Sequence, residues 1–166
     1  MIRKIEDFER NWQYEADSTA TLFKNLTDES LGQKVTDDGR SLGFLAWHIV
    51  TTLGEMPGHV GLKIDAPAVD SEVPTSAAEI VSAFETAANS VKEEVAKNWT
   101  DETLELEDNM YGETWKRGFT LLCLMMHQTH HRGQMTVLMR QAGLKVNGIY
   151  GPAKEEWQAF GMPAMP

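Results

Sequence analysis

Three of the five histidines lie within one short window, His127-Gln128-Thr129-His130-His131. The window is part of a long apolar stretch without proline, which indicates a buried helix. On a helix, His127 and His131 share one face because they are four residues apart, whereas His130 lies about 100° around from His131. Two imidazoles at that spacing can bind one metal ion. We predict that His127 and His131 form such a pair, with His127 and His130 as the alternative.

A catalytic zinc-type site needs three protein ligands and an open position for water or substrate. His48 is the expected third ligand, because Leu45, His48 and Glu55 trace one line along a second predicted helix. Helical bundles build metal sites from side chains on facing helices. His59 follows a Pro-Gly pair and is predicted to lie in a loop. Glu55 is expected to be a solvated carboxylate near the helix end, with a role beside the ligands or in proton transfer as the alternative.

Two other chemistries are disfavoured by the residues around the pair. Gln128 stands where the His-Glu-x-x-His motif of zinc proteases has its general base, so peptidase activity of that kind is not expected. Cys123 continues the four-residue spacing, but it lies about 12 Å along the axis from His131, too far for both to bind one ion. Cys123 is therefore interpreted as a small buried hydrophobe.

The elements that must position these residues are helical. Apolar residues recur every three or four positions in four segments, at about 5–26, 42–55, 76–98 and 114–141. Ser41 is a predicted N-cap, Ser76 to Glu79 has the form of a capping box, and Gly143 is a helix stop. No segment has a convincing strand pattern. The sequence predicts an all-α four-helix bundle whose long connections allow crossovers.

Composition places further limits on the chain. Its 166 residues fit one domain, 1–166, with a tail at 144–166 that holds a short helical turn near 153–160 and packs on the bundle. The net charge of −10 argues against nucleic acid and anionic membranes as partners. No run approaches the roughly 18 apolar residues of a membrane span. One cysteine and a charged N-terminus indicate a cytoplasmic protein.

Two stretches together resemble the DinB/YfiT-like family. One is His127 followed by His130-His131-Arg132-Gly133-Gln134 in a helix that ends at Gly143, and the other is Leu42-Gly-Phe-Leu-Ala-Trp-His48-Ile. Helix order and length match over nearly the whole chain. The resemblance implies a four-helix bundle with crossed connections, often a homodimer. It also implies a divalent metal ion, nickel or zinc, held by His48, His127 and His131.

The resemblance leaves the reaction open, because a shared fold fixes activity weakly. Some relatives transfer low-molecular-weight thiols such as bacillithiol or mycothiol to electrophiles, and others isomerise maleylpyruvate. The leading hypothesis is a metal-dependent thiol S-transferase acting on a small molecule. The alternatives are a non-catalytic metal-binding stress-response scaffold, a metal-dependent hydrolase, and a plain bundle with hydrogen-bonded histidines. Arg132 is expected to be a structural ion-pair partner, and Gly133 to allow close approach by a helix or the tail.

Overall fold

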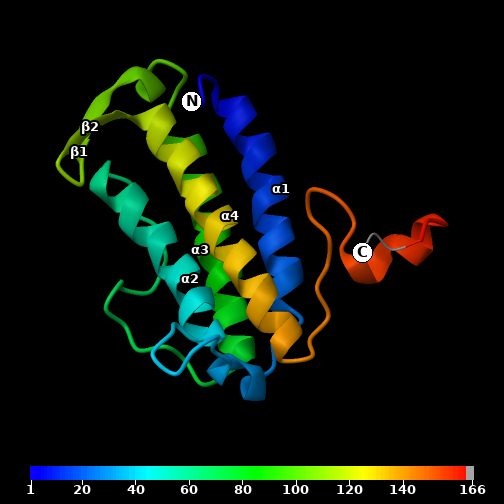
Figure 1. The fold of residues 1–166 in the computed structure, drawn as a ribbon. Coiled ribbons are helices and arrows are strands. Elements are labelled where there is room, and N and C mark those ends of the chain that lie inside the picture. Colours follow the sequence, from blue (N-terminus) through cyan, green and yellow to red (C-terminus); the bar gives the residue numbers. More distant parts are fainter. Residues whose placement is uncertain (164–166) are drawn as a thin grey trace.

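The computed structural model describes residues 1–163; residues 164–166, the end of the predicted tail 144–166, lie outside the described part. Four long helices make up the body (Figure 1). The helices are α1 (Ile5–Phe23), α2 (Leu42–His59), α3 (Ala77–Asn98) and α4 (Arg117–Gln141). The shorter elements are the 3₁₀ helices η1 (Asp28–Gly32), η2 (Thr103–Glu105) and η3 (Lys154–Phe160) and the strands β1 (Glu107–Met110) and β2 (Glu113–Lys116).

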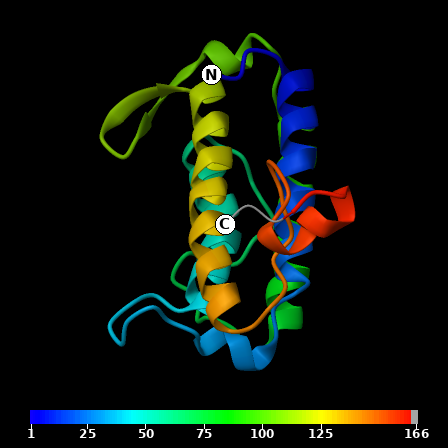
Figure 2. The same ribbon diagram turned by 45° about the vertical axis from the view of Figure 1, so that its right-hand side comes forward.

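The helices form a bundle with crossed connections. The main packing partners of α2 are α3 and α4, and those of α1 are also α3 and α4. Thus α1 and α2, although consecutive in sequence, are not the principal neighbours of each other, and the same holds for α3 and α4. Figures 1 and 2 show this arrangement from two sides. The predicted bundle with crossovers is confirmed, and the crossing brings α2 directly against α4.

The core is filled by the apolar stripes of the four helices. Phe23 and Phe84 pack with ring centroids 5.0 Å apart, and Phe8 stacks on Trp12. The buried indole N–H of Trp12 donates to the Ala88 carbonyl at 2.9 Å, so burial leaves this polar group satisfied. Within residues 1–163, no helix combines the length and the apolar character that crossing a membrane requires.

The helix caps agree with the sequence in two places and differ in one. Ser41 accepts a hydrogen bond from the Phe44 backbone N–H, and Gly143 has φ +73° just after α4, as predicted. The capping box predicted at Ser76 is wrong, because the Ser76 side chain makes no capping bond. Instead, the Asp28 carboxylate accepts from the Ala77 N–H at 2.7 Å and supplies the cap from η1.

The second helix is longer than predicted. We expected Pro57 to end it near Glu55, but α2 continues to His59 with Pro57 inside it. A proline removes one backbone donor and disturbs only the preceding turn, so a helix that ends two residues later loses little. His59 is therefore the last helical residue, not a loop residue.

A small β-hairpin stands where no strand was expected. The strands β1 and β2 pair antiparallel, with Glu107 opposite Lys116 and Met110 opposite Glu113. Their turn places Tyr111 and Gly112 at φ 56° and 88°, the positive values that a tight hairpin turn needs. Four-residue strands are too short to give a clear alternation of apolar residues. The hairpin also takes up Thr114, so α4 begins at Arg117 and not at Thr114.

Candidate metal centre

The structure brings together His48 from α2 and His127 and His131 from α4. The Nε2 atom of His127 lies 3.3 Å from Nε2 of His48 and 3.2 Å from Nε2 of His131. One ring nitrogen from each of the three residues lies within 4.8 Å of the others. Ligand nitrogens around a tetrahedral zinc ion are about 3.3 Å apart, given bonds of roughly 2.0–2.1 Å. The cluster therefore has the dimensions of a three-histidine metal site.

Hydrogen bonding supports the same interpretation of the cluster. The Nδ1 atom of His131 lies 2.8 Å from Oε1 of Gln134. An amide oxygen only accepts, so His131 carries its proton on Nδ1 and its Nε2 presents a lone pair. In either tautomer, Nε2 of His127 cannot form a good hydrogen bond to both neighbouring Nε2 atoms, because it is either a single donor or an acceptor facing the lone pair of His131. One cation, in contrast, can bind a lone pair from each of the three rings. The donor set thus fits a divalent metal ion that prefers imidazole, such as nickel or zinc.

The histidines are held in the neutral form that binds metal. Burial lowers the pKa of His127 to about 4, helped by the nearby His131, His48 and His130. Burial also lowers the pKa of His48, with contributions from His131 and Arg40, and Glu55 acts in the opposite direction. The pKa of His131 is lowered mainly by burial, although its hydrogen bond to Gln134 opposes the shift. Neutral imidazoles keep their lone pairs available to a cation near neutral pH.

Neighbouring residues of the window lie elsewhere. His130 is exposed and contacts Gln134 at 3.1 Å, and it is not part of the cluster. Cys123 is a half-buried free cysteine whose pKa is raised by burial, and it also lies outside the cluster. Gln128 is buried in the core with 1% exposure, and no residue from 1 to 163 hydrogen-bonds to its side-chain amide.

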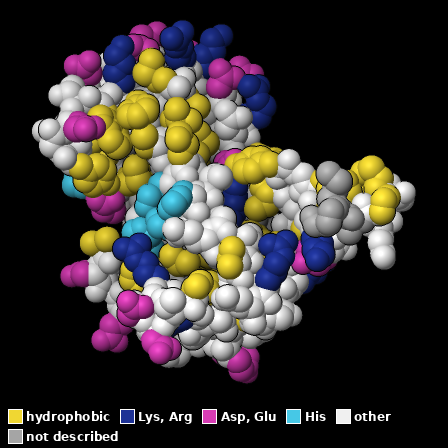
Figure 3. Space-filling view, viewed as in Figure 1, with side chains coloured by type: hydrophobic (Ala, Val, Ile, Leu, Met, Phe, Trp, Pro, Cys, Tyr) yellow, Lys and Arg dark blue, Asp and Glu magenta, His cyan; other side chains and the backbone are white. Residues whose placement is uncertain are grey.

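An aromatic row that the sequence reasoning missed runs along the hairpin to α4. Tyr111, Trp115 and Phe119 follow one another with ring centroids 5.9 and 5.1 Å apart. The Tyr111 hydroxyl donates to both oxygens of Glu55, and His59 contacts the same carboxylate at 3.0 Å. The expectation that Glu55 is simply solvated is therefore wrong. Figure 3 shows the histidines at the surface, next to a broad hydrophobic patch.

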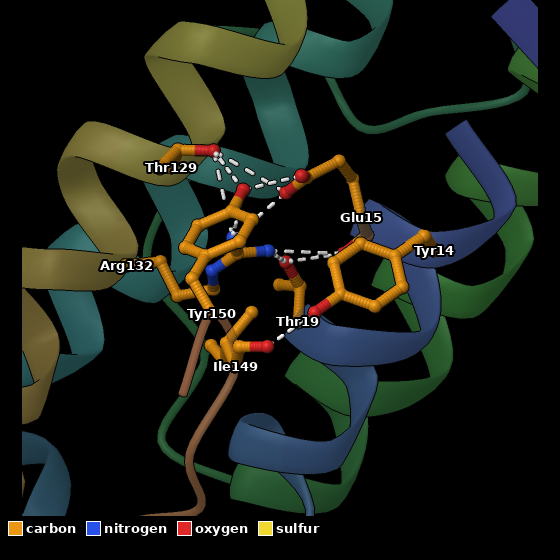
Figure 4. Close-up of polar contacts among 7 residues, drawn as sticks. All are labelled: Tyr14, Glu15, Thr19, Thr129, Arg132, Ile149 and Tyr150. Carbon is orange, nitrogen blue, oxygen red and sulfur yellow. Dashed lines mark hydrogen bonds and ion pairs between the residues drawn. The ribbon is translucent and has the colours of Figure 1, made fainter. Parts of the chain in front are cut away.

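A buried ion pair joins α4 to α1 on the side away from the cluster. Arg132 is 1% exposed and donates to the Glu15 carboxylate at 2.7 Å, which confirms its predicted structural role. It also donates to the Glu15 carbonyl and to Thr19. The Tyr150 hydroxyl, from the tail, bonds to Glu15 and accepts from Arg132 (Figure 4). The pair thereby connects two helices and the tail.

Two features of the outer surface of α4 complete the description. The close approach predicted at Gly133 is not found, because a Cβ atom there would meet nothing within 4 Å. A hollow of about 800 Å³ lies between α1 and α4, lined by residues that include Met125, Met126 and Tyr150. Of the histidines, only His130 lines it, so the hollow is separate from the three-histidine cluster.

The model of the DinB family matches residues 1–165. The chain belongs to the DinB family. A DinB relative from Bacillus subtilis (strain 168), described only as the uncharacterized protein YrdA, is 47% identical over 164 residues, covering 99% of this chain and 98% of its own length.

Solved structures of DinB-like proteins share the fold. One from Bacillus cereus ATCC 10987 is 41% identical with a TM-score of 0.88, covering 90% of this DinB chain and 100% of its own. Another, YjoA from Bacillus subtilis, has a TM-score of 0.68 at 15% identity, covering 89% and 99% of the two chains. At that identity, YjoA supports the fold alone.

Replacing Gln134 with leucine should weaken metal binding by roughly 10- to 100-fold, because the outer hydrogen bond to His131 would be lost. Competition with a coloured chelator measures the affinity. Gln141→Leu makes the same chemical change at the end of the same helix and should leave the affinity unchanged. Equal affinities for the two variants would show that Gln134 does not orient His131.

Proposed function

We propose that this DinB-family protein is a metal-dependent enzyme that transfers a low-molecular-weight thiol to an electrophilic substrate. The observation that carries the proposal is the convergence of three neutral imidazole nitrogens beside a partly exposed surface. His48, His127 and His131 would hold a nickel or zinc ion, and three protein ligands leave a coordination position for an outside molecule. When bound, such an ion lowers the pKa of a coordinated thiol and so supplies a nucleophile near neutral pH.

The chain's own residues have limited but definite roles in such a reaction. The thiol loses its proton to solvent, its sulfur bonds to the electrophilic carbon, and the leaving group departs with the electron pair. Gln134 fixes the ring of His131, and the aromatic row of Tyr111, Trp115 and Phe119 offers an apolar surface near the cluster. Glu55 is occupied by Tyr111 and His59, so its hydrogen bonds hold the hairpin against α2.

The first test measures the metal content of protein purified without exposure to chelator or acid. We expect about one equivalent of a transition metal, as a single three-ligand site would hold. The loaded protein is then incubated with bacillithiol, mycothiol, glutathione or coenzyme A and a chromogenic electrophile, and conjugate formation is followed with and without metal. Metal-dependent acceleration supports the transferase. Bound metal without acceleration by any thiol favours a non-catalytic scaffold, hydrolysis in place of conjugation favours a hydrolase, and absence of metal refutes all three.

The proposal extends to the assembly and setting of the protein. The family resemblance supports a homodimer, and the exposed side chains of Met126 and Val137 give the outer face of α4 apolar surface for a second copy. The single cysteine, which forms no internal disulfide, supports a cytoplasmic location.

A further inference from the structure

A stacked column of side chains leads from the start of α2 to the histidine cluster. The Arg40 guanidinium carbon lies 5.0 Å from the centre of the Phe44 ring. The Phe44 ring in turn stacks on His48, with centroids 6.0 Å apart and planes 12° from parallel. Phe44 and His48 are four positions apart in α2 and so share one face of the helix, whereas Arg40 lies just before the Ser41 N-cap and reaches Phe44 from outside the helix. The Arg40 guanidinium is therefore no farther from the centre of the His48 ring than these two steps of 5.0 and 6.0 Å taken together.

The positive charge of Arg40 is not neutralised by a neighbouring carboxylate. Across residues 1–163, no Asp or Glu lies within ion-pair distance of Arg40, although the sequence has 25 acidic and 15 basic residues. Asp37 and Asp38 precede it in the same loop and make no ion pair with it. Four other arginines do pair with carboxylates: Arg10, Arg117, Arg132 and Arg140. Arg40 is thus an exposed guanidinium held in place by an aromatic ring, with its donors available.

The surroundings of the cluster differ on its two sides. On the Arg40 side there is a fixed positive charge, and this charge contributes to the lowered pKa values of both His48 and His131. On the hairpin side lies the aromatic row, whose nearby carboxylate, Glu55, is already bonded to Tyr111. In Figure 3 the broad hydrophobic patch lies above the histidines, and basic side chains are found below them among smaller hydrophobic areas.

We propose that Arg40 is a specificity-determining residue that binds the carboxylate of the thiol used at the histidine site. A guanidinium presents parallel donors that match a carboxylate in a bidentate way. The single charge of a carboxylate also equals the single charge of the one guanidinium present. The aromatic row would then contact the apolar part of the electrophile. This inference rests on the proposed thiol transfer and names the chemical class of its thiol substrate.

Binding of a matched pair of thiols tests the inference. The probes are mercaptopropionate and its neutral isostere mercaptopropionamide, titrated by calorimetry into metal-free and cobalt-loaded protein. We expect the wild type to prefer the carboxylate by about tenfold, which is typical of one charged hydrogen-bonded pair. Arg40→Gln should remove the preference. Lys97→Gln, which changes the net charge equally at an exposed position on α3, should retain it.

Two separate measurements, the absorption spectrum of the cobalt-loaded protein and the calorimetric affinities, distinguish this inference from the proposed function. A thiolate-to-cobalt absorption band reports coordination of sulfur by the metal, and its absence with both thiols would contradict thiol transfer. The calorimetric preference for carboxylate still decides the role of Arg40 in that case. Equal affinities for the two thiols in the wild type, the same preference in Arg40→Gln, or no measurable binding of either thiol would overturn the inference.

Discussion

Replacing His131 with alanine should abolish stoichiometric metal binding, whereas replacing His130 with alanine should leave it intact. The two residues are adjacent in sequence, but only His131 directs its Nε2 atom at His127. Loss of one of three ligands should weaken binding by more than the roughly 10- to 100-fold expected for an outer hydrogen-bond partner. Elemental analysis after gel filtration, with calorimetric titration of nickel and zinc, measures the difference.

The comparison needs a check on folding, because His131 is buried and His130 is exposed. Circular dichroism melts of the metal-free variants show whether each is folded at the temperature of the binding experiment. His131→Gln keeps more of the side-chain volume and should also lose the metal. If His131→Ala bound one equivalent, or if His130→Ala lost it, the ligand set proposed for this site would be wrong.

Replacing Arg132 with methionine should lower the free energy of unfolding by about 3–5 kcal/mol. The substitution leaves the Glu15 carboxylate buried between α1 and α4 without its cation, and an uncompensated buried charge is strongly destabilising. Urea denaturation of the metal-free protein measures the change. The loss is expected to lower the urea concentration at the midpoint of unfolding. The dependence of the unfolding free energy on urea concentration should change little, because the same surface is exposed on unfolding.

Two further variants give this second prediction its controls. Arg140→Met breaks the exposed ion pair between Arg140 and Glu155, whose side chains are 41% and 42% exposed, respectively. This substitution should change the free energy of unfolding by only about 0–1 kcal/mol. The double variant Glu15→Leu with Arg132→Met should regain much of the lost stability, because no charge is then left buried. A loss at Arg132→Met no larger than that at Arg140→Met would show that the buried pair is not stabilising.

Most of the helical framework could be predicted because its signals are local. The three-to-four spacing of apolar residues located four helices, and Ser41 and Gly143 marked helix ends that the structure retains. The same spacing placed His127 and His131 on the inner face of α4. The same spacing put His48 on the inward line of its own helix and made it the expected third ligand, and the family resemblance added the crossed order that packs α2 on α4.

The remaining features depend on contacts between residues far apart in sequence. The cap of α3 comes from Asp28, which is 49 residues away from Ala77. The aromatic row depends on a hairpin too short for any periodic pattern. Arg40 and Glu15 look like ordinary surface charges in the sequence. Only the fold shows that Arg40 has no ion-pair partner among residues 1–163 and stacks on Phe44 next to His48, and that Glu15 is buried and bonded to Tyr150.

The crossed helix order also determines when the histidine site can form during folding. His48 and His127 are 79 residues apart, and α2 and α4 are separated along the chain by α3 and the hairpin. Contacts between residues so far apart in sequence restrict the chain and cost conformational entropy before they contribute favourable free energy. We therefore expect the cluster to assemble after the rate-limiting barrier to folding. A bound ion would then slow unfolding while leaving the refolding rate nearly unchanged.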